Sequence, residues 1–168
     1  TEHPGNPVIR HGRNLGDGPT LMGWDPKIRK YLFWPRPGHG LAPEIYGTGD
    51  HRHIRSHAYS TSDDFIHWRD DRLVLEPDKN DPPGTEFYGL SAFPYGSQYL
   101  GLVWVFHTAQ QTMYSQLVSS RDGVKWERSV YRRPFIVLGY MVNHYVGKSF
   151  DSGMVFPVSE PVVKDGEI

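Results

Sequence analysis

Short apolar runs separated by turn residues make up the pattern of hydrophobic and polar positions along this chain. Between residues 85 and 126 the chain passes through three such runs, at 85–93, 99–106 and 113–118. Runs of this length that are rich in β-branched and aromatic residues are typical of β-strands. No window of ten or more residues has the 3.6-residue period of an amphipathic helix. The pattern therefore predicts an all-β protein built from antiparallel meanders.

The unit has a predicted fourth strand at residues 134–138, and its parts recur elsewhere in the chain. Segments 16–24 and 30–34 match its first and second strands in the same order. A third copy starts at residues 150–157. A repeat made of four short strands is typical of the blades of a β-propeller. We therefore expect a propeller fold.

An acidic residue opens each copy and sets the period of the repeat. Asp17, Glu86 and Asp151 are 69 and then 65 residues apart. About two and a half four-stranded blades are thus present, whereas the smallest propellers close with about four. We expect self-association, or chain segments beyond these, to complete the ring. The single partial propeller domain, 1–168, divides into blade one at 17–75, blade two at 86–138 and the start of blade three at 151–168.

Composition and charge narrow the range of partners. The chain is 38% hydrophobic and 14% aromatic, which is enough to pack a core. A net charge of -1 gives no reason to expect nucleic acid or an anionic membrane as a partner. No apolar run approaches the length of a transmembrane helix, and no signal peptide is recognisable. The absence of cysteine excludes disulfides and thiolate sites, and leaves secreted, periplasmic and cytoplasmic locations open.

The longest connections between the predicted strands are rich in Pro, Gly and His. In an up-and-down meander alternate connections lie on the same side of the sheet, so we expect these long ones to share one side with the three acids. Variable loops around fixed groups on a rigid scaffold are typical of a functional site. The alternative is that long loops fall where they are tolerated. The connections concerned are 35–50, 76–84, 107–112 and 139–149.

The three acids are the candidate catalytic residues. First strands line the channel of a propeller, so Asp17, Glu86 and Asp151 are predicted to converge near one mouth. Cleavage of a glycosidic bond needs a pair of carboxyl groups, one to protonate the leaving oxygen and one to act as base or nucleophile. The alternative is that each acid is an ordinary turn residue before a strand.

Aromatic side chains near this side are candidate sugar contacts. Trp34, Tyr88 and Trp104 lie in the predicted inner strands, and His107 ends the second strand of blade two. Aromatic rings stack on the apolar faces of sugar rings, but aromatic residues of inner strands also form cores. Both interpretations stay open for these four residues.

Three histidines raise the question of a metal site. His51, His53 and His57 lie on one face of a predicted extended strand. Along a strand this spacing spreads the three imidazoles over roughly 20 Å, too far for one ion. We therefore predict no metal and no other cofactor, and interpret these side chains as loop histidines.

A turn motif, Ser-x-Asp-x-x-x-Trp, occurs at 62–68 and again at 120–126. We expect the Asp to accept backbone N–H groups across the turn and the Trp to pack between blades, on the side away from the acids. This motif, with an acid opening each inner strand, resembles the five-bladed propeller glycosidases: the invertase and levanase group, the arabinanase and xylosidase group, and the related mannoside phosphorylases. It is one residue shorter than the similar box of the sialidases.

The resemblance implies a five-bladed fold with a funnel-shaped site that holds an Asp base or nucleophile, a second Asp and a Glu acid. Carried over to this chain, it makes Asp17 the base or nucleophile, Glu86 the general acid and Asp151 the supporting carboxylate. The order of the acids here, Asp, Glu, Asp, differs from the Asp, Asp, Glu of those relatives. The sequences typical of invertases are also missing.

The sequence is compatible with three functions. The leading one is a glycoside hydrolase acting on an oligo- or polysaccharide. A glycoside phosphorylase needs a basic pocket for phosphate, which Arg36, Arg52 and Arg55 are placed to supply. The third is a non-catalytic propeller module that binds glycans or protein. Amide variants of the three acids distinguish an enzyme, which loses turnover, from a module that keeps its ligand.

Overall fold

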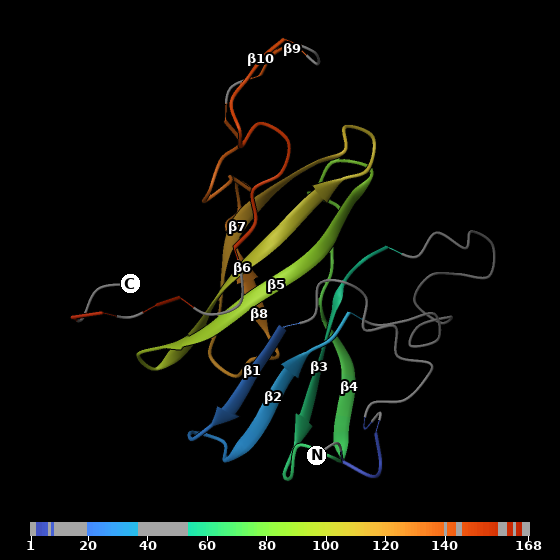
Figure 1. Ribbon diagram of the computed structural model, residues 1–168, viewed down its shortest axis with the longest axis vertical. Coiled ribbons are helices and arrows are strands. Elements are labelled where there is room, and N and C mark those ends of the chain that lie inside the picture. Colours follow the sequence, from blue (N-terminus) through green and yellow to red (C-terminus); the bar gives the residue numbers. More distant parts are fainter. Residues whose placement is uncertain are drawn as a thin grey trace, which may run out of the picture.

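The protein is an all-β structure, as predicted. In the computed structural model the described residues are 3–6, 8, 20–36, 54–139, 141–143, 146–157, 161–162 and 164–165. Across these ranges no segment forms a helix long and apolar enough to cross a membrane. Within the described ranges the strands form two four-stranded sheets and one small two-stranded sheet (Figure 1).

The first sheet is an antiparallel meander in which each strand pairs with the next along the chain. At its first turn, Asp25 accepts a hydrogen bond from the backbone N–H of Lys27 at 2.8 Å. Arg29 then takes a positive φ of 55° and returns the chain. Its strands are β1 (Thr20–Asp25), β2 (Lys30–Trp34), β3 (His57–Ser62) and β4 (Trp68–Leu75).

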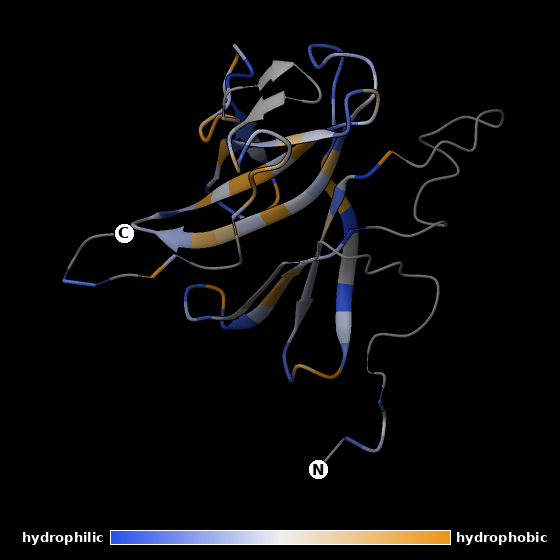
Figure 2. Ribbon diagram, turned by 45° about the horizontal axis from the view of Figure 1, so that its top comes forward, coloured by the Kyte–Doolittle hydropathy of each residue, from blue (hydrophilic) through white to orange (hydrophobic). Residues whose placement is uncertain are grey.

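The second sheet repeats this meander with longer strands. Along β6 buried and half-buried residues alternate, so that Tyr99, Val103 and Val105 face the first sheet. Figure 2 shows hydrophobic residues gathered along the middle of this sheet. Its strands are β5 (Thr85–Tyr95), β6 (Gln98–His107), β7 (Thr112–Ser120) and β8 (Trp126–Arg128).

The fourth strand of the second sheet differs from the prediction. β8 occupies this place, whereas residues 134–138 form no named strand. Ile136 makes an isolated antiparallel bridge to Ser115, and the N–H of Phe135 donates to the Ser115 carbonyl at 2.8 Å. Because β8 pairs only with the last residues of β7, the rest of that edge is open to the returning chain.

A hairpin lies within the connection predicted at 139–149. It consists of β9 (Met141–Asn143) and β10 (Val146–Lys148), which pair antiparallel at the far end of the second sheet from the first sheet (Figure 1). The N–H of Gly139 donates to the Asp151 carbonyl at 3.1 Å and closes its base. The sequence pattern did not predict these short strands.

The segment predicted as the first strand of blade three follows this hairpin. Residues 150–157 form no named strand and no third sheet of their own within the described ranges. Met154 instead makes a parallel bridge to Met113 on β7. The N–H of Val155 donates to the Met113 carbonyl at 2.8 Å. The segment therefore lies along the second sheet.

The two large sheets share one core, and Trp34 lies at its centre. Its side chain has no exposed surface, and its indole N–H donates to the Gly123 carbonyl at 2.9 Å. The ring centroids of Tyr59, Tyr99 and Trp126 lie 6.5, 6.0 and 5.7 Å away. Burial of this large aromatic residue joins the first sheet to the turn before β8.

The structural role predicted for the Ser-x-Asp turns is confirmed for both Asp residues and for Trp126, and the predicted packing between blades is wrong for Trp68. One oxygen of Asp64 accepts the N–H groups of the residues two and three positions later, at 2.9 and 2.7 Å. Asp122 does the same at 2.8 Å for both. These backbone hydrogen bonds hold the pKa of each carboxyl group below its usual range. Trp126 packs between the sheets against Trp34, whereas Trp68 packs within its own sheet against Phe33.

Candidate functional site

The candidate site lies at the end of the two sheets where β2 ends and where β3 and β5 begin. The backbone N–H of Phe87 donates to the Arg55 carbonyl at 2.8 Å and joins the start of β5 to the residues before β3. The short Ser-x-Asp turns lie at the opposite end of the strands. The end of the sheets with the long connections is therefore also the end that carries Glu86.

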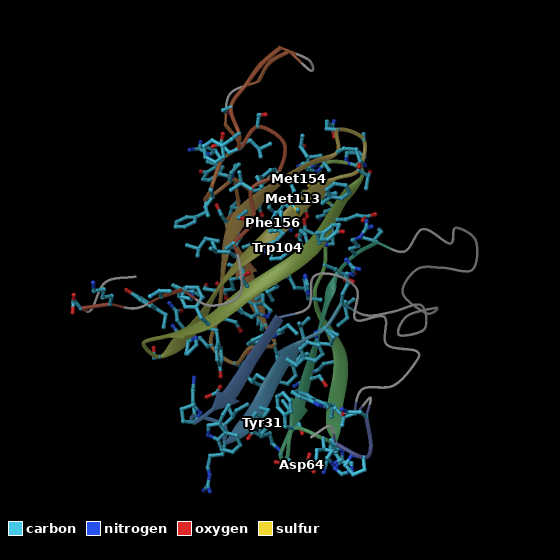
Figure 3. The ribbon with its side chains drawn as sticks, in the orientation of Figure 1. Tyr31, Asp64, Trp104, Met113, Met154 and Phe156 are labelled. Atoms are coloured by element: carbon cyan, nitrogen blue, oxygen red, sulfur yellow. The ribbon has the colours of Figure 1, made fainter. Side chains whose placement is uncertain are left out.

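A cleft of about 570 Å³ opens on the outer face of the second sheet. Most of its lining is aromatic or apolar, contributed by β5, β6, β7 and the segment 150–157 (Figure 3). Thr108 and Gln111 add polar groups at the connection between β6 and β7. Arg55 is the one charged residue among the described lining residues. The apolar members are Tyr88, Trp104, Phe106, Met113, Met154 and Phe156.

Trp104 forms the floor of the cleft because a glycine lies beneath it. A Cβ atom built on Gly89 would lie 2.4 Å from Trp104 Cε3, so only glycine lets the ring rest on β5 at this point. The indole N–H donates to Ser91 Oγ at 3.2 Å. The ring of Phe156 lies 4.8 Å from it, tilted by 36°. The ring of Trp104 is thus held in place from both sides.

An ion pair adjoins the aromatic wall. The guanidinium of Arg55 donates from Nη1 to Oε2 of Glu86, whose side chain is only 15% exposed. The same guanidinium lies over the rings of Tyr88 and Phe106, 4.9 and 5.7 Å from their centroids. A second guanidinium, that of Arg36, lies 5.2 Å from the Tyr88 centroid. Two cations and one carboxylate therefore surround one tyrosine.

Two of the predicted sugar contacts lie in this cleft and one does not. Tyr88 and Trp104 line it. Trp34 does not, because it is fully buried between the sheets and has no surface to offer a ligand. We therefore remove Trp34 from the candidate set.

His107 ends β6 but is not among the residues that line the cleft. Its ring lies 5.4 Å from that of Tyr114, and Nδ1 lies 3.4 Å from the hydroxyl of Thr85. Burial lowers the pKa of His107, with the nearby Asp81 carboxylate acting in the opposite sense. The half-buried imidazole packs against the ring of Tyr114 on β7.

Asp151, the third predicted acid, lies in the turn that follows the hairpin. A Cβ atom built on Gly139 would lie 1.9 Å from Asp151 Oδ1, so the carboxylate packs directly against that glycine. Asp151 does not line the cleft. Asp17 lies outside the described residues. The predicted meeting of three acids therefore remains a prediction.

The prediction that His51, His53 and His57 are loop histidines is wrong for His57. His57 begins β3 and is fully buried, and burial lowers its pKa from 6.5 to about 4, with Arg36 acting in the same direction. His51 and His53 lie outside the described residues, as does Arg52. Among the residues that the structure does describe, no three His, Asp or Glu side chains are grouped as a metal site would require.

Sequence reasoning missed Phe106 and Phe156 as parts of the cleft. Phe106 could have been predicted, because a residue two positions after Trp104 on a strand lies on the same face. Phe156 could not have been predicted, because its segment packs on β7 from about 40 residues further along the chain. The hydrogen bond from Ser115 Oγ to the Val155 carbonyl is one of the contacts that hold the segment there.

Comparison with known proteins bears on the fold. No protein-family model matches the sequence, and no curated protein matches it. An N-acetylgalactosamine deacetylase from F. plautii, solved with blood group B trisaccharide, superposes with a TM-score of 0.52 at 21% identity over 73% of this chain and 31% of that one. A fructofuranosidase from Schwanniomyces occidentalis, solved with fructosylnystose, gives 0.51 at 13% identity over 77% and 26%.

The fold is that of a β-propeller. The predicted resemblance to the five-bladed propeller glycosidases is thereby confirmed at the level of the fold. The chain spans less than a third of the length of either solved relative. At these identities the likeness concerns the path of the chain and assigns no residue a role.

Proposed function

We propose that this chain is part of a propeller enzyme that cleaves a glycosidic bond in an oligo- or polysaccharide. The observation that carries the proposal is the position of Glu86. It is paired with Arg55 beside an aromatic cleft, at the end of the sheets that has the long connections. Glu86 is not itself among the residues that line the cleft and adjoins it through Arg55, so the proposal places the sugar ring on the aromatic wall and its anomeric carbon toward Glu86.

The lining of the cleft suits a sugar. Its volume, about 570 Å³, lies within the usual range for small-molecule sites. Phe156 and Met154, which are 48% and 44% exposed, offer apolar surface for the C–H groups of a pyranose or furanose, and the ring of Trp104 lies behind Phe156. Thr108 and Gln111 supply hydroxyl and amide groups for its hydroxyls. Few polar groups against apolar walls orient a ligand without a large desolvation cost.

The ion pair favours one role for Glu86 over the other. As the partner of Arg55 it is a carboxylate, which accepts a proton or stabilises positive charge but has no proton to give. We therefore propose Glu86 as the base or nucleophile. The general-acid role implied by the resemblance requires the pair with Arg55 to open when substrate binds.

A second carboxyl group completes the mechanism, and we propose Asp17 or Asp151 for it. Retaining enzymes hold the two groups about 5 Å apart, and inverting enzymes about 6.5 to 9.5 Å, which leaves room for a water molecule. One of these acids then protonates the leaving oxygen while Glu86 acts on the anomeric carbon or on water.

Amide substitution tests the proposal. A panel of aryl glycosides and natural oligosaccharides is screened for hydrolysis, and the best substrate is followed with Glu86→Gln, Asp17→Asn and Asp151→Asn. We expect Glu86→Gln to lower kcat by at least about 100-fold, as loss of a group that transfers protons or attacks does. Glu127→Gln, at an exposed position on β8, serves as the control. Full activity in Glu86→Gln contradicts the proposal.

A non-catalytic glycan-binding module is the second candidate. It is favoured by the placement of the two described acids, because Glu86 is held by Arg55 and Asp151 packs against Gly139, away from the cleft lining. In that case the amide variants keep their affinity for glycan and no hydrolysis is found. The phosphorylase alternative is supported by the two guanidiniums at Tyr88, and requires turnover that depends on inorganic phosphate.

A further inference from the structure

We propose that the cleft on the second sheet prefers a deoxyhexose, a sugar in which a methyl group replaces the hydroxymethyl arm of an ordinary hexose. The methyl group packs against the apolar part of the cleft, where a hexose would place a hydroxyl. This inference rests on the proposed function, because it takes the cleft to be the sugar site. It adds the chemical class of the sugar, which neither the fold nor the comparisons supply.

The described lining of the cleft divides into a polar end and an apolar row. The polar end, at the end of the sheets with the long connections, consists of Arg55, Tyr88, Thr108 and Gln111. The apolar row consists of Met113, Met154, Phe156 and Trp104. Figure 3 shows the four side chains of the row one below another, from the polar end down the second sheet. A sugar bound across both parts therefore meets two different surfaces.

The N–H groups along the apolar row are already used within the protein. The N–H of Met113 donates to the Gly153 carbonyl at 3.1 Å, and the N–H of Val155 donates to the Met113 carbonyl at 2.8 Å. The indole N–H of Trp104 donates to Ser91 Oγ at 3.2 Å, and that hydroxyl donates onward to a backbone carbonyl. A sugar hydroxyl placed on the row finds none of these donors free to bind it. Burying it there therefore costs hydrogen bonds to water that are not replaced.

The outer members of the apolar row offer surface that a methyl group can cover. Met154 and Phe156 are each nearly half exposed, so a ligand can reach them. Covering apolar surface is favourable in proportion to the area removed from water. The unbranched thioether of Met154 also adapts its shape to the group that packs against it. The row thus favours a methyl group at the place where it disfavours a hydroxyl.

The polar end sets the orientation of the sugar. Glu86 adjoins the cleft through Arg55 at that end, so the anomeric carbon is directed there. Gln111 has two amide N–H groups and gives one of them to the Thr108 carbonyl at 2.8 Å. The hydroxyls nearest to the anomeric carbon can thus pair with groups of the polar end. The hydroxymethyl arm of a hexose, or the methyl group of a deoxyhexose, then extends toward the apolar row.

A deoxyhexose fits the apolar row better than an acetamido sugar does. Both carry a methyl group, but the acetamido methyl is joined to an amide whose N–H and C=O also need partners. Because the N–H donors along the row are already used, the acetamido carbonyl would stay unpaired there. We therefore commit to the deoxyhexose, and a preference for acetamido sugars is an outcome of the test.

Matched sugars that differ by one oxygen atom provide the test. Methyl glycosides of L-fucose and L-galactose, and of L-rhamnose and L-mannose, are titrated, and their affinities are measured by ligand-observed NMR. We expect the deoxyhexose of the better pair to bind about tenfold more tightly, as one small apolar group in a hydrophobic pocket allows. Met154→Gln, which places an amide on the apolar row, should reduce that ratio to less than about twofold. Val130→Gln, at a side chain that is 84% exposed and outside the cleft lining, should leave the ratio unchanged.

Each result supports or overturns a distinct claim. Equal binding of the paired sugars, or a preference that survives in Met154→Gln, overturns the inference and leaves the proposed sugar site intact. A preference for acetamido sugars over their parent hexoses, without one for deoxyhexoses, overturns it in favour of the acetamido class. Failure to bind any of these sugars or the oligosaccharides of the hydrolysis screen contradicts the proposed function itself. If Met154→Gln does not fold, Phe156→Gln, on the same row, must show the reduced ratio for the inference to stand.

Discussion

Gly123 and Phe65 occupy the same position in the two Ser-x-Asp turns, and both have a positive φ, of 75° and 65°. This conformation costs an L-residue roughly 1–2 kcal/mol, whereas glycine adopts it freely. In the first turn the cost to Phe65 is offset by ring contacts with Tyr31 and Trp68, at 5.1 and 5.5 Å. In the second turn a Cβ atom at Gly123 would lie 3.2 Å from Trp34 Cζ2.

Gly123→Ala is therefore expected to lower the free energy of unfolding by about 2 kcal/mol, from backbone strain together with displacement of Trp34. Gly96→Ala is the matched control, because Gly96 also has a positive φ, of 56°, but nothing lies within 4 Å of its Cβ position. Urea unfolding should show a smaller loss for the control. Equal losses would mean that the contact with Trp34 has no energetic weight.

His57 should make stability depend on pH. The unfolded chain takes up a proton near pH 6.5, but the buried imidazole does not do so until about pH 4. The contribution is therefore fully present above pH 6.5 and is lost as the pH falls from 6.5 to 4, by roughly 3 kcal/mol. Urea unfolding of the parent protein and His57→Gln over this range measures it. A slope that persists unchanged in the variant would contradict this assignment.

At the scale of elements, the connection between the two large sheets is fixed by a buried ion pair. Arg128, at the end of β8, donates to both oxygens of Asp81 at 2.6 and 2.7 Å, and also to Gln116 Oε1 at 2.8 Å. The two side chains are 5% and 3% exposed. Burial alone would raise the pKa of Asp81, but its hydrogen bonds and the charges of Arg128 and Arg132 lower it overall.

Arg128→Ala should lower the free energy of unfolding by about 3–5 kcal/mol, because it leaves the Asp81 carboxylate buried without its bidentate partner and with only the more distant Arg132, 3.9 Å away, as an ion pair. Arg133→Ala, at an exposed position a few residues later, should change it by less than about 0.5 kcal/mol. Replacing both members of the pair with leucine should restore part of the loss. A loss of less than 1 kcal/mol in Arg128→Ala would show that the pair contributes little.

The first two strands of the first sheet and the first three of the second were predictable because local alternation and turn chemistry encode them, whereas the position of β8 was not. β6, with its alternating burial, and the Ser-x-Asp turns are examples. The bridges from Ile136 and Met154 to β7 were not predictable, since each depends on which part of a strand edge remains open after folding. The same limit concealed the part that Phe156 plays in the cleft.

At the scale of the whole molecule, whether an aromatic residue is buried or accessible depends on what covers that face of its sheet. The repeat matches Trp34 of the first sheet with Trp104 of the second, and for both the sequence left a sugar contact and a place in the core open. The second sheet covers Trp34 completely, whereas Trp104 faces the cleft and is contacted there by Phe156. The sequence could therefore indicate the end of the sheets that carries Glu86, Tyr88 and Trp104, but not which tryptophan stays accessible.

The indole N–H resonances of the five tryptophans test the central claim, that the cleft on the second sheet binds glycan. They are recorded by NMR during titration with the natural oligosaccharide that binds best and are assigned with single Trp→Phe variants. The account predicts that the Trp104 resonance shifts in a saturable manner while that of buried Trp34 stays in place. Saturable binding that leaves Trp104 unmoved, or that shifts Trp24 or Trp68 on the first sheet instead, would contradict it.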